Sequence, residues 1–163
     1  MVFGTRCGRV LLAFCGLLFA VANARGGQDA RPDSELPDKL TLYSIERVPE
    51  GENPQQAELF HDYVIRGQLE VSDPTKLRTI FKALMDGLAQ GKKGDIAFCF
   101  DPHHAIRTVR HGKVVDYLIC FHCSIVHKFR PGAAGYQMLP ISKRPQATFD
   151  RALQRAGVRL PAK

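Results

Sequence analysis

The chain has 163 residues, of which 45% are hydrophobic and 24% charged, and its formal net charge is +7. This length supports one domain with a modest core, and the sequence contains no internal repeat and no second domain. The positive charge gathers beyond residue 127, where eight Lys or Arg residues stand against a single acidic residue, Asp150. No motif of a nucleic-acid reader accompanies this charge, so specific nucleic-acid binding is not expected.

The first 24 residues have the pattern of a secretory signal peptide. Arg6 and Arg9 form a positive region, and an apolar run of 13 residues follows from Val10 to Ala22. Small side chains at Ala22 and Ala24 fit a cleavage site. The run is too short to cross the roughly 30 Å of bilayer hydrocarbon as a permanent helix. We therefore expect cleavage near Ala24 and export to the periplasm or to the extracellular medium.

Cleavage after residue 24 would leave 139 residues and lower the formal net charge to +5. Residues 25–38 are polar, contain Gly and Pro and show no periodicity, which predicts a disordered tether. The β-forming residues from Leu40 to Val48 predict a first strand, and alternating apolar residues from Tyr63 to Val71 predict a second. The folded domain is therefore expected over residues 39–163.

The clearest helix follows the second strand. Asp73 is placed to cap it, and Pro74 occupies the first helical position, where a missing N–H costs nothing. Gly91 is expected to end it. The apolar residues of this segment recur at helical spacing and predict one core-facing stripe: Leu77, Ile80, Phe81, Leu84, Met85 and Leu88.

The rest of the chain predicts a long hairpin, a short strand and a final helix. The two hairpin strands, the short strand and the helix are expected at Ile96–Arg110, Lys113–Phe129, Tyr136–Leu139 and Pro145–Gly157. The final helix would bury Phe149 and Leu153 and carry arginines on its outer side. The resulting order is ββαβββα, an α+β fold in which two helices cover one face of an antiparallel sheet.

The hairpin holds the three cysteines of the mature chain and five of its six histidines. If His111-Gly112 is a two-residue turn, Arg110 faces Lys113 and Arg107 forms a favourable cross-strand pair with Asp116. The same register aligns a polar row that could hold zinc or copper: Cys99, Asp101, His103, Cys120 and His122.

Pro102 offers a second register for the same hairpin. A proline inside a strand usually marks an edge or a bulge. One extra residue there would set Cys99 opposite Cys123 and leave Cys120 as a buried thiol. Because exported proteins fold under oxidising conditions, a Cys99–Cys123 disulfide is the expected pairing.

Cys120-Phe121-His122-Cys123 is a CxxC motif, but its surroundings are β in character. On a strand, residues three apart lie about 10 Å apart and point to opposite faces. Redox motifs of this kind instead begin at a helix N-terminus, so a thioredoxin-like function is not favoured.

A nucleophilic cysteine is the remaining alternative at this site. Cys99 or Cys120 beside His103 or His104, oriented by Asp101 or Asp116, has the residue types of a thiol-dependent hydrolase. No oxyanion hole or glycine-rich nucleophile turn accompanies them, so no catalytic residue is assigned.

Several short motifs are spread along the chain: Tyr43-Ser44, Phe60-His61-x-Tyr63, Cys99-Phe100-x-Pro102-x-His104-x-Ile106-Arg107, Gly112-Lys113-x-Val115-Asp116 and Ile119-Cys120-Phe121-x-Cys123. Together with the Pro145–Gly157 helix, they resemble an uncharacterised family of small exported bacterial proteins. The resemblance implies an architecture and no activity. It favours His104 over His103 as the histidine that joins Cys99 and Cys123, and therefore favours the bulged register. It also implies that a metal role for His122 would be peculiar to this chain, because relatives tend to carry an acidic residue there.

We therefore expect an exported, non-enzymatic binding or structural module stabilised by a Cys99–Cys123 disulfide. The alternative is a zinc- or copper-binding protein that uses Cys99, His103, His104, Cys120, His122 and Cys123. A thiol-dependent hydrolase is the weaker alternative. The basic final helix could contact anionic surfaces of the cell envelope, although a solvated helix face explains the same arginines.

Overall fold

The computed structural model describes Met1 and residues 35–92 and 99–161. The predicted signal peptide, most of the predicted tether and the start of the predicted hairpin at Ile96 lie outside these residues. The elements are β1 (Lys39–Arg47), a 3-10 turn (Pro54–Gln56), β2 (Leu59–Phe60), β3 (Tyr63–Val71), α1 (Pro74–Ala89), β4 (His104–Arg110), β5 (Lys113–Cys120), β6 (Ile125–Phe129), β7 (Tyr136–Pro140) and α2 (Gln146–Arg155). No helix in this part of the chain is long and apolar enough to span a bilayer.

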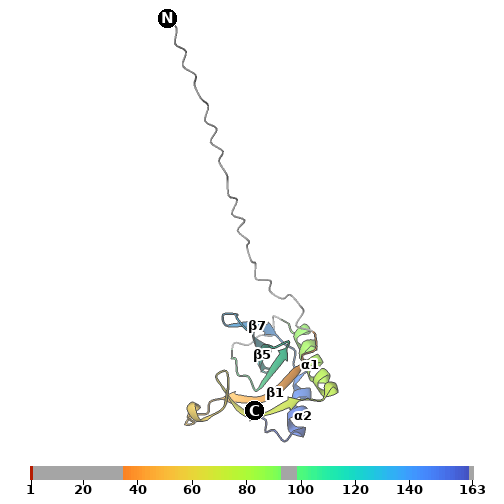
Figure 1. The fold of residues 1–163 in the computed structure, drawn as a ribbon. Helices are drawn as coiled ribbons and strands as arrows, with labels where there is room; N and C mark the ends of the chain where they lie inside the picture. The colour runs from red at the N-terminus through yellow and green to blue at the C-terminus, as the bar shows by residue number, and fades with distance from the viewer. Residues whose placement is uncertain (2–34, 93–98, 162–163) are drawn as a thin grey trace. The chain divides into compact units, whose positions relative to one another are not determined.

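The strands form one antiparallel sheet in the order β2-β3-β1-β4-β5-β6-β7, and both helices lie on one side of it (Figure 1). The α+β class with an antiparallel sheet and two helices is confirmed. The predicted order ββαβββα is wrong in detail, since three strands precede α1 and four follow it. The extra early strand is the two-residue β2, which pairs with the start of β3 and is too short to give a sequence pattern.

The hairpin register near the turn is confirmed. Arg110 pairs with Lys113, and every pair back to His104 and Ile119 follows the predicted alignment. His111 and Gly112 both have positive φ, 47° and 75°, as a two-residue hairpin turn requires.

The prediction of one strand from Lys113 to Phe129 is wrong. A turn at residues 121–124 divides this segment into β5 and β6, which pair with each other from Cys120 and Ile125 outward. Ser124 takes a φ of 56° in this turn, which reverses the chain. The apolar character of the whole segment arises because β5 and β6 are both interior strands of the sheet.

The two helices form as predicted. Asp73 accepts a hydrogen bond from the backbone N–H of Lys76 at 2.7 Å and so caps α1. Gly157, with a φ of 73°, ends the turn that follows α2. The stripe of α1 and the buried residues of α2 share one core cluster with the sheet, in which Phe149 and Leu153 are fully buried.

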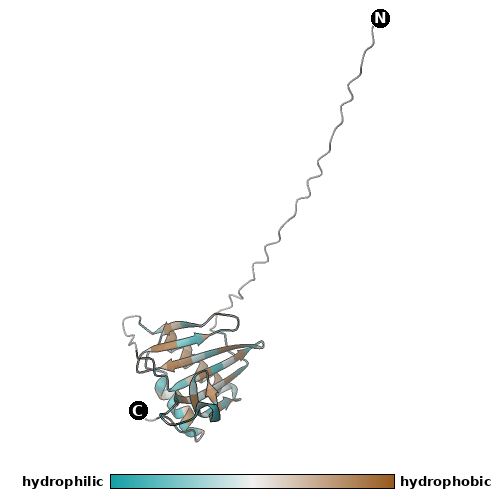
Figure 2. Cartoon of the chain, turned by 90° about the vertical axis from the view of Figure 1, so that its left-hand side faces the viewer, coloured by the Kyte–Doolittle hydropathy of each residue, from teal (hydrophilic) through white to brown (hydrophobic). Residues whose placement is uncertain are grey.

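The sheet has two distinct faces, and both carry apolar side chains; apolar segments are seen on several of its strands (Figure 2). The helix face carries Leu42, Ile106, Tyr117 and Ile119, which pack in the cluster with α1 and α2. The opposite side, here called the aromatic face, carries a second cluster of Tyr43, Ile45, Phe60, Ala105 and Leu118, with further rings packed against it. Two candidate site residues on the sheet can contact each other only if they lie on the same face.

Candidate functional site: a three-cysteine cluster beside an aromatic face

The CxxC motif forms the turn between β5 and β6. Cys120 ends β5 and Cys123 lies inside the turn, so their Cα atoms are 5.3 Å apart and their sulfurs form a disulfide. Both residues are fully buried, and the backbone N–H of Cys123 points at Cys120 Sγ at 3.1 Å. The argument from strand geometry that kept these cysteines apart fails here because the strand ends at Cys120.

The structure therefore replaces the predicted Cys99–Cys123 disulfide with a Cys120–Cys123 disulfide and leaves Cys99 as a free, exposed cysteine. The predicted partners are nevertheless close, since Cys99 Sγ lies 3.7 Å from Cys123 Sγ. Cys123 Sγ also contacts the backbone carbonyl oxygen of Cys99. Cys123 Sγ thus contacts both other sulfur atoms of the cluster.

The predicted metal ligands are not gathered around these sulfurs. His103 lies 3.6 Å from Asp101, and its side chain is about one-third exposed. His104 Nε2 lies 2.7 Å from a carboxylate oxygen of Asp150 on the helix face. Within the described ranges, no group of three His, Cys, Asp or Glu residues is arranged to hold a metal ion. With Cys120 and Cys123 bonded to each other, zinc or copper binding is a proposal for the reduced protein only.

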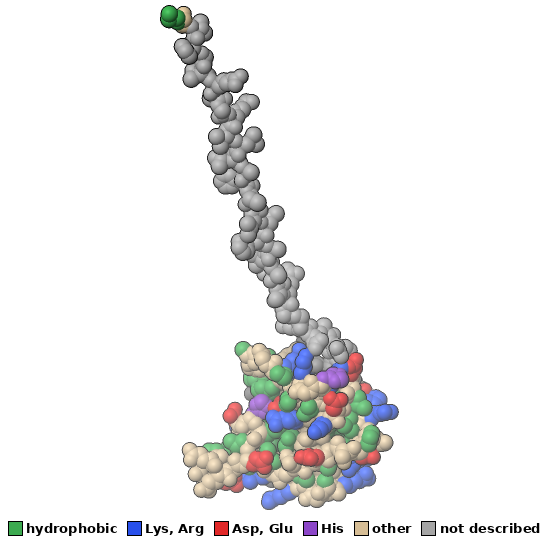
Figure 3. Space-filling model, in the orientation of Figure 1, with side chains coloured by type: hydrophobic (Ala, Val, Ile, Leu, Met, Phe, Trp, Pro, Cys, Tyr) green, Lys and Arg blue, Asp and Glu red, His purple; other side chains and the backbone are tan. Residues whose placement is uncertain are grey.

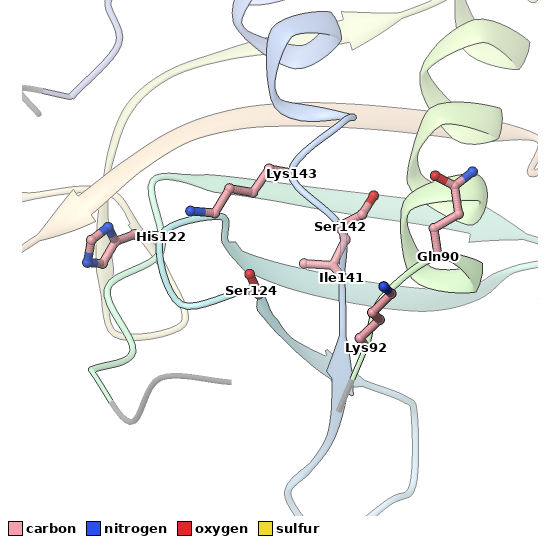
Figure 4. Close-up of a pocket in the computed structure, with 7 residues that line it drawn as sticks. All are labelled: Gln90, Lys92, His122, Ser124, Ile141, Ser142 and Lys143. Atoms are coloured by element: carbon pink, nitrogen blue, oxygen red, sulfur yellow. The ribbon is translucent and has the colours of Figure 1, made fainter. Parts of the chain in front are cut away.

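His122 lies in a separate pocket of about 490 Å³ near the end of α1 (Figure 4). The residues that line it are Gln90, Lys92, His122, Ser124, Ile141, Ser142 and Lys143. Two lysines and no carboxylate line this pocket, which disfavours binding of a metal cation there.

Of the nucleophiles and bases proposed for a hydrolase, Cys120 and His104 lie on opposite faces of the sheet. His104 pairs with Ile119, which belongs to the helix-face core, whereas the next residue, Cys120, packs with Ile125 and Phe100 on the aromatic face. Neighbouring residues on a strand point to opposite sides. The His104–Asp150 pair therefore has the form of a catalytic dyad but does not face the sulfurs. His104 is 3% exposed and packs against Phe121 and Phe149, as expected for a core histidine held by one carboxylate.

Eight rings form an unbroken series of contacts across the aromatic face. Successive ring centroids lie between 3.6 and 6.5 Å apart. In order of contact, the series is Tyr43, Phe60, His61, Phe129, Tyr136, His127, Phe100 and Tyr63. Sequence analysis did not predict this series. The available signal was the alternation of His127 and Phe129, with Tyr136 across the following turn.

Arg107 and Asp116 form the predicted cross-strand pair, and the structure adds His61 to it. Arg107 donates two hydrogen bonds to the Asp116 carboxylate, at 2.8 and 2.7 Å, and His61 Nε2 lies 3.1 Å from the same group. Hydrogen bonding to Asp116 raises the pKa of Arg107 above its usual value. The Arg107 guanidinium carbon also lies 5.0 Å from the centre of the Phe60 ring. This ion pair lies against Phe60 and His61, the second and third rings of the series.

His127 lies further along the series, stacked between Phe100 and Tyr136 at 3.6 and 3.8 Å. It is 8% exposed, and its Nε2 has no hydrogen-bond partner within the described structure. Burial lowers the pKa of His127 below its usual value.

This depressed pKa gives His127 a defined effect on stability. Around the unfolded pKa of about 6.5, the unfolded chain binds more protons than the folded one, so the free energy of unfolding rises with pH. The stabilisation is fully present above that value and is lost as the pH falls towards the lower folded pKa. We expect His127→Phe to lose less stability than the wild type between pH about 7.5 and about 5.5 in urea unfolding. Equal losses in the two proteins would contradict this assignment.

Charged side chains are mixed on the face seen in Figure 3, where Lys and Arg are interspersed with Asp and Glu. The arginines predicted on the outer side of α2, Arg151 and Arg155, are exposed.

Comparison with family models, with curated proteins and with solved structures yields no match.

Proposed function

We propose that the chain is an exported, non-enzymatic binding module that takes up an extended polypeptide segment along β7. The observation that carries the proposal is that β7 is an exposed and uncharged edge strand. β7 is the last strand of the described sheet, all five of its residues are at least partly exposed, and none of them is charged. Edge strands of natural proteins are normally protected by charged residues, bulges or a covering element. Among the described residues, this edge carries no charged side chain, and its main-chain groups before Pro140 can hydrogen-bond to an added strand.

The side chains of β7 give this edge a recognition surface. Tyr136 and Met138 are about half exposed, and they face Phe129 and His127 of β6 in register. An added strand would place every second side chain beside Tyr136 and Met138, so the series of rings would continue onto the bound segment. Main-chain bonds would supply affinity, and apolar or aromatic side chains at alternate positions would supply specificity.

The disulfide has a structural role in this proposal. The turn that it closes joins β5 to β6, and its Ser124 carbonyl accepts a hydrogen bond from Ile141, just beyond β7, at 3.0 Å. Fixing the turn therefore fixes the start of β6 and the end of β7 together. Cys120 and Cys123 are only three residues apart, so in the chain-entropy account their bond stabilises the fold by about 2 kcal/mol. A bond between Cys99 and Cys123, 24 residues apart, would give about 3.5 kcal/mol.

The experiment is the selection of random-sequence peptides on the immobilised mature protein, followed by titration of a selected peptide in solution. We expect selected peptides to be rich in apolar or β-branched residues. Met138→Lys should weaken their binding about tenfold or more, because it puts a charge where the bound strand would lie. Amide hydrogen exchange should show new protection in residues 136–140 when peptide is bound.

The matched control is Leu59→Lys, which places the same charge at a half-exposed leucine on β2, the opposite edge of the sheet. This variant should bind the selected peptides as the wild type does. The proposal fails if Met138→Lys binds them unchanged, or if protection appears only outside β7. Self-association of the free protein that Met138→Lys abolishes would identify a second copy as the added strand.

A further inference from the structure

The cysteine cluster combines an exposed sulfur with a buried disulfide. Cys99 is exposed, while Cys120 and Cys123 are fully buried. The free sulfur of Cys99 lies 3.7 Å from Cys123 Sγ, which is van der Waals contact for two sulfur atoms. Thiol–disulfide exchange begins with a thiolate in contact with one sulfur of a disulfide. That starting arrangement is already formed in the folded chain.

We propose that this cluster is a thiol–disulfide exchange site with two interchangeable pairings that share Cys123. The Cys99 thiolate attacks Cys123 Sγ, a Cys99–Cys123 bond forms, and the Cys123–Cys120 bond breaks. Cys120 leaves with the electron pair and takes up a proton, so the chain is neither oxidised nor reduced overall. This inference does not rest on peptide binding at β7, although it concerns the disulfide that fixes the turn between β5 and β6.

The surroundings of the cluster support this direction of exchange. The leaving sulfur, Cys120 Sγ, already receives the backbone N–H of Cys123 at 3.1 Å, which stabilises negative charge as the bond breaks. Cys120 otherwise packs with Ile125 and Phe100, an apolar environment that favours the neutral thiol once it is protonated. The proton therefore ends on the buried sulfur.

The exchange gives external thiols access to a disulfide that is otherwise buried. In the observed pairing both bonded sulfurs are shielded, whereas the second pairing contains the exposed Cys99. An external thiolate can attack Cys99 there, form a mixed disulfide and release Cys123 as a thiolate. The substrates of the site are thus thiols, and Cys99 is the residue at which they react.

The experiment uses the mature protein and three variants, exported by the chain's own signal and purified without reductant. Each sample is quenched in acid, unfolded, alkylated and mapped by peptide mass spectrometry. Cys120→Ala should form a Cys99–Cys123 disulfide with no alkylatable thiol. Cys123→Ala should leave both remaining cysteines alkylatable, because it removes the shared sulfur. Cys99→Ala should keep the Cys120–Cys123 bond, and in the native state reduced glutathione should reduce it about tenfold more slowly than in the wild type.

Near-ultraviolet circular dichroism establishes that each variant is folded before it is mapped. Cys99→Ala should disturb the core packing least, because Cys99 is exposed whereas Cys120 and Cys123 are buried. The proposal is overturned if folded Cys120→Ala keeps two free thiols, or if Cys123→Ala forms a Cys99–Cys120 bond. Reduction of Cys99→Ala at the wild-type rate would also overturn it, because the buried disulfide would then be reached without Cys99.

Discussion

Replacement of Phe149 by alanine is expected to lower the free energy of unfolding by about 3–5 kcal/mol. The Phe149 side chain is fully buried in the cluster that joins α2 to the sheet. Its ring lies 5.8 Å from that of Phe121 and 6.1 Å from that of His104. The substitution removes the apolar contacts of a whole ring and leaves a cavity between α2 and the end of β5. Urea unfolding at neutral pH measures the change.

The matched control for this prediction is Arg151→Ala, an exposed position on the same helix, which should change the free energy of unfolding by no more than about 0.5 kcal/mol. Because Phe121 opens the turn that carries Cys123, Phe149→Ala should also speed amide exchange in residues 121–124. If Phe149→Ala left both the midpoint and the slope of the urea unfolding curve unchanged, α2 would not stabilise the sheet through Phe149.

The helices could be predicted from the sequence because each carries its own signals. Asp73 and Pro74 mark the start of α1, and an uninterrupted apolar stripe marks the side that it buries. The register of β4 and β5 was predictable for a related reason, since His111-Gly112 sets the turn and Arg107 and Asp116 are charged partners across it. Local chemistry determined these features.

The turn at residues 121–124 could not be predicted in the same way. The segment around it is apolar because β5 and β6 are both interior strands, and apolar periodicity alone does not show where such a segment folds back. The change of pairing from Cys99–Cys123 to Cys120–Cys123 follows from this single turn. Sequence analysis identified the three cysteines of the cluster. It paired Cys99 with Cys123 because it assumed one continuous strand from Lys113 to Phe129.

The aromatic face was invisible for a different reason. Its rings come from six segments between Tyr43 and Tyr136, and except for neighbours across a short turn only the order of strands in the sheet brings them together. His61 illustrates this, since its partners Phe129 and Asp116 lie on β6 and β5. No spacing within the sequence predicts such a contact, so these rings could be placed together only from the order of the strands in the sheet.

Replacement of Asp116 by alanine is expected to lower the free energy of unfolding by about 2–4 kcal/mol. Asp116 is 6% exposed and accepts both hydrogen bonds from Arg107, and His61 lies against the same carboxylate. Its loss leaves the guanidinium without a counter-charge above Phe60. The expected cost stays below that of a fully buried pair because the Arg107 side chain is 43% exposed and can reach water.

A double-mutant cycle with Arg107→Ala separates the pair from the packing around it. We expect a coupling free energy of about 1–3 kcal/mol between the two positions in urea unfolding. Lys82 and Asp86 on α1 are the matched exposed pair, with side chains 70% and 51% exposed, and their coupling should stay near 0.5 kcal/mol. Since Asp116 also holds His61 against Phe129, Asp116→Ala should increase amide exchange across β2 and β6. Coupling no larger than that of the α1 pair would mean that the aromatic face is held by its rings alone, because the charges beneath them would then contribute no more than a solvated ion pair.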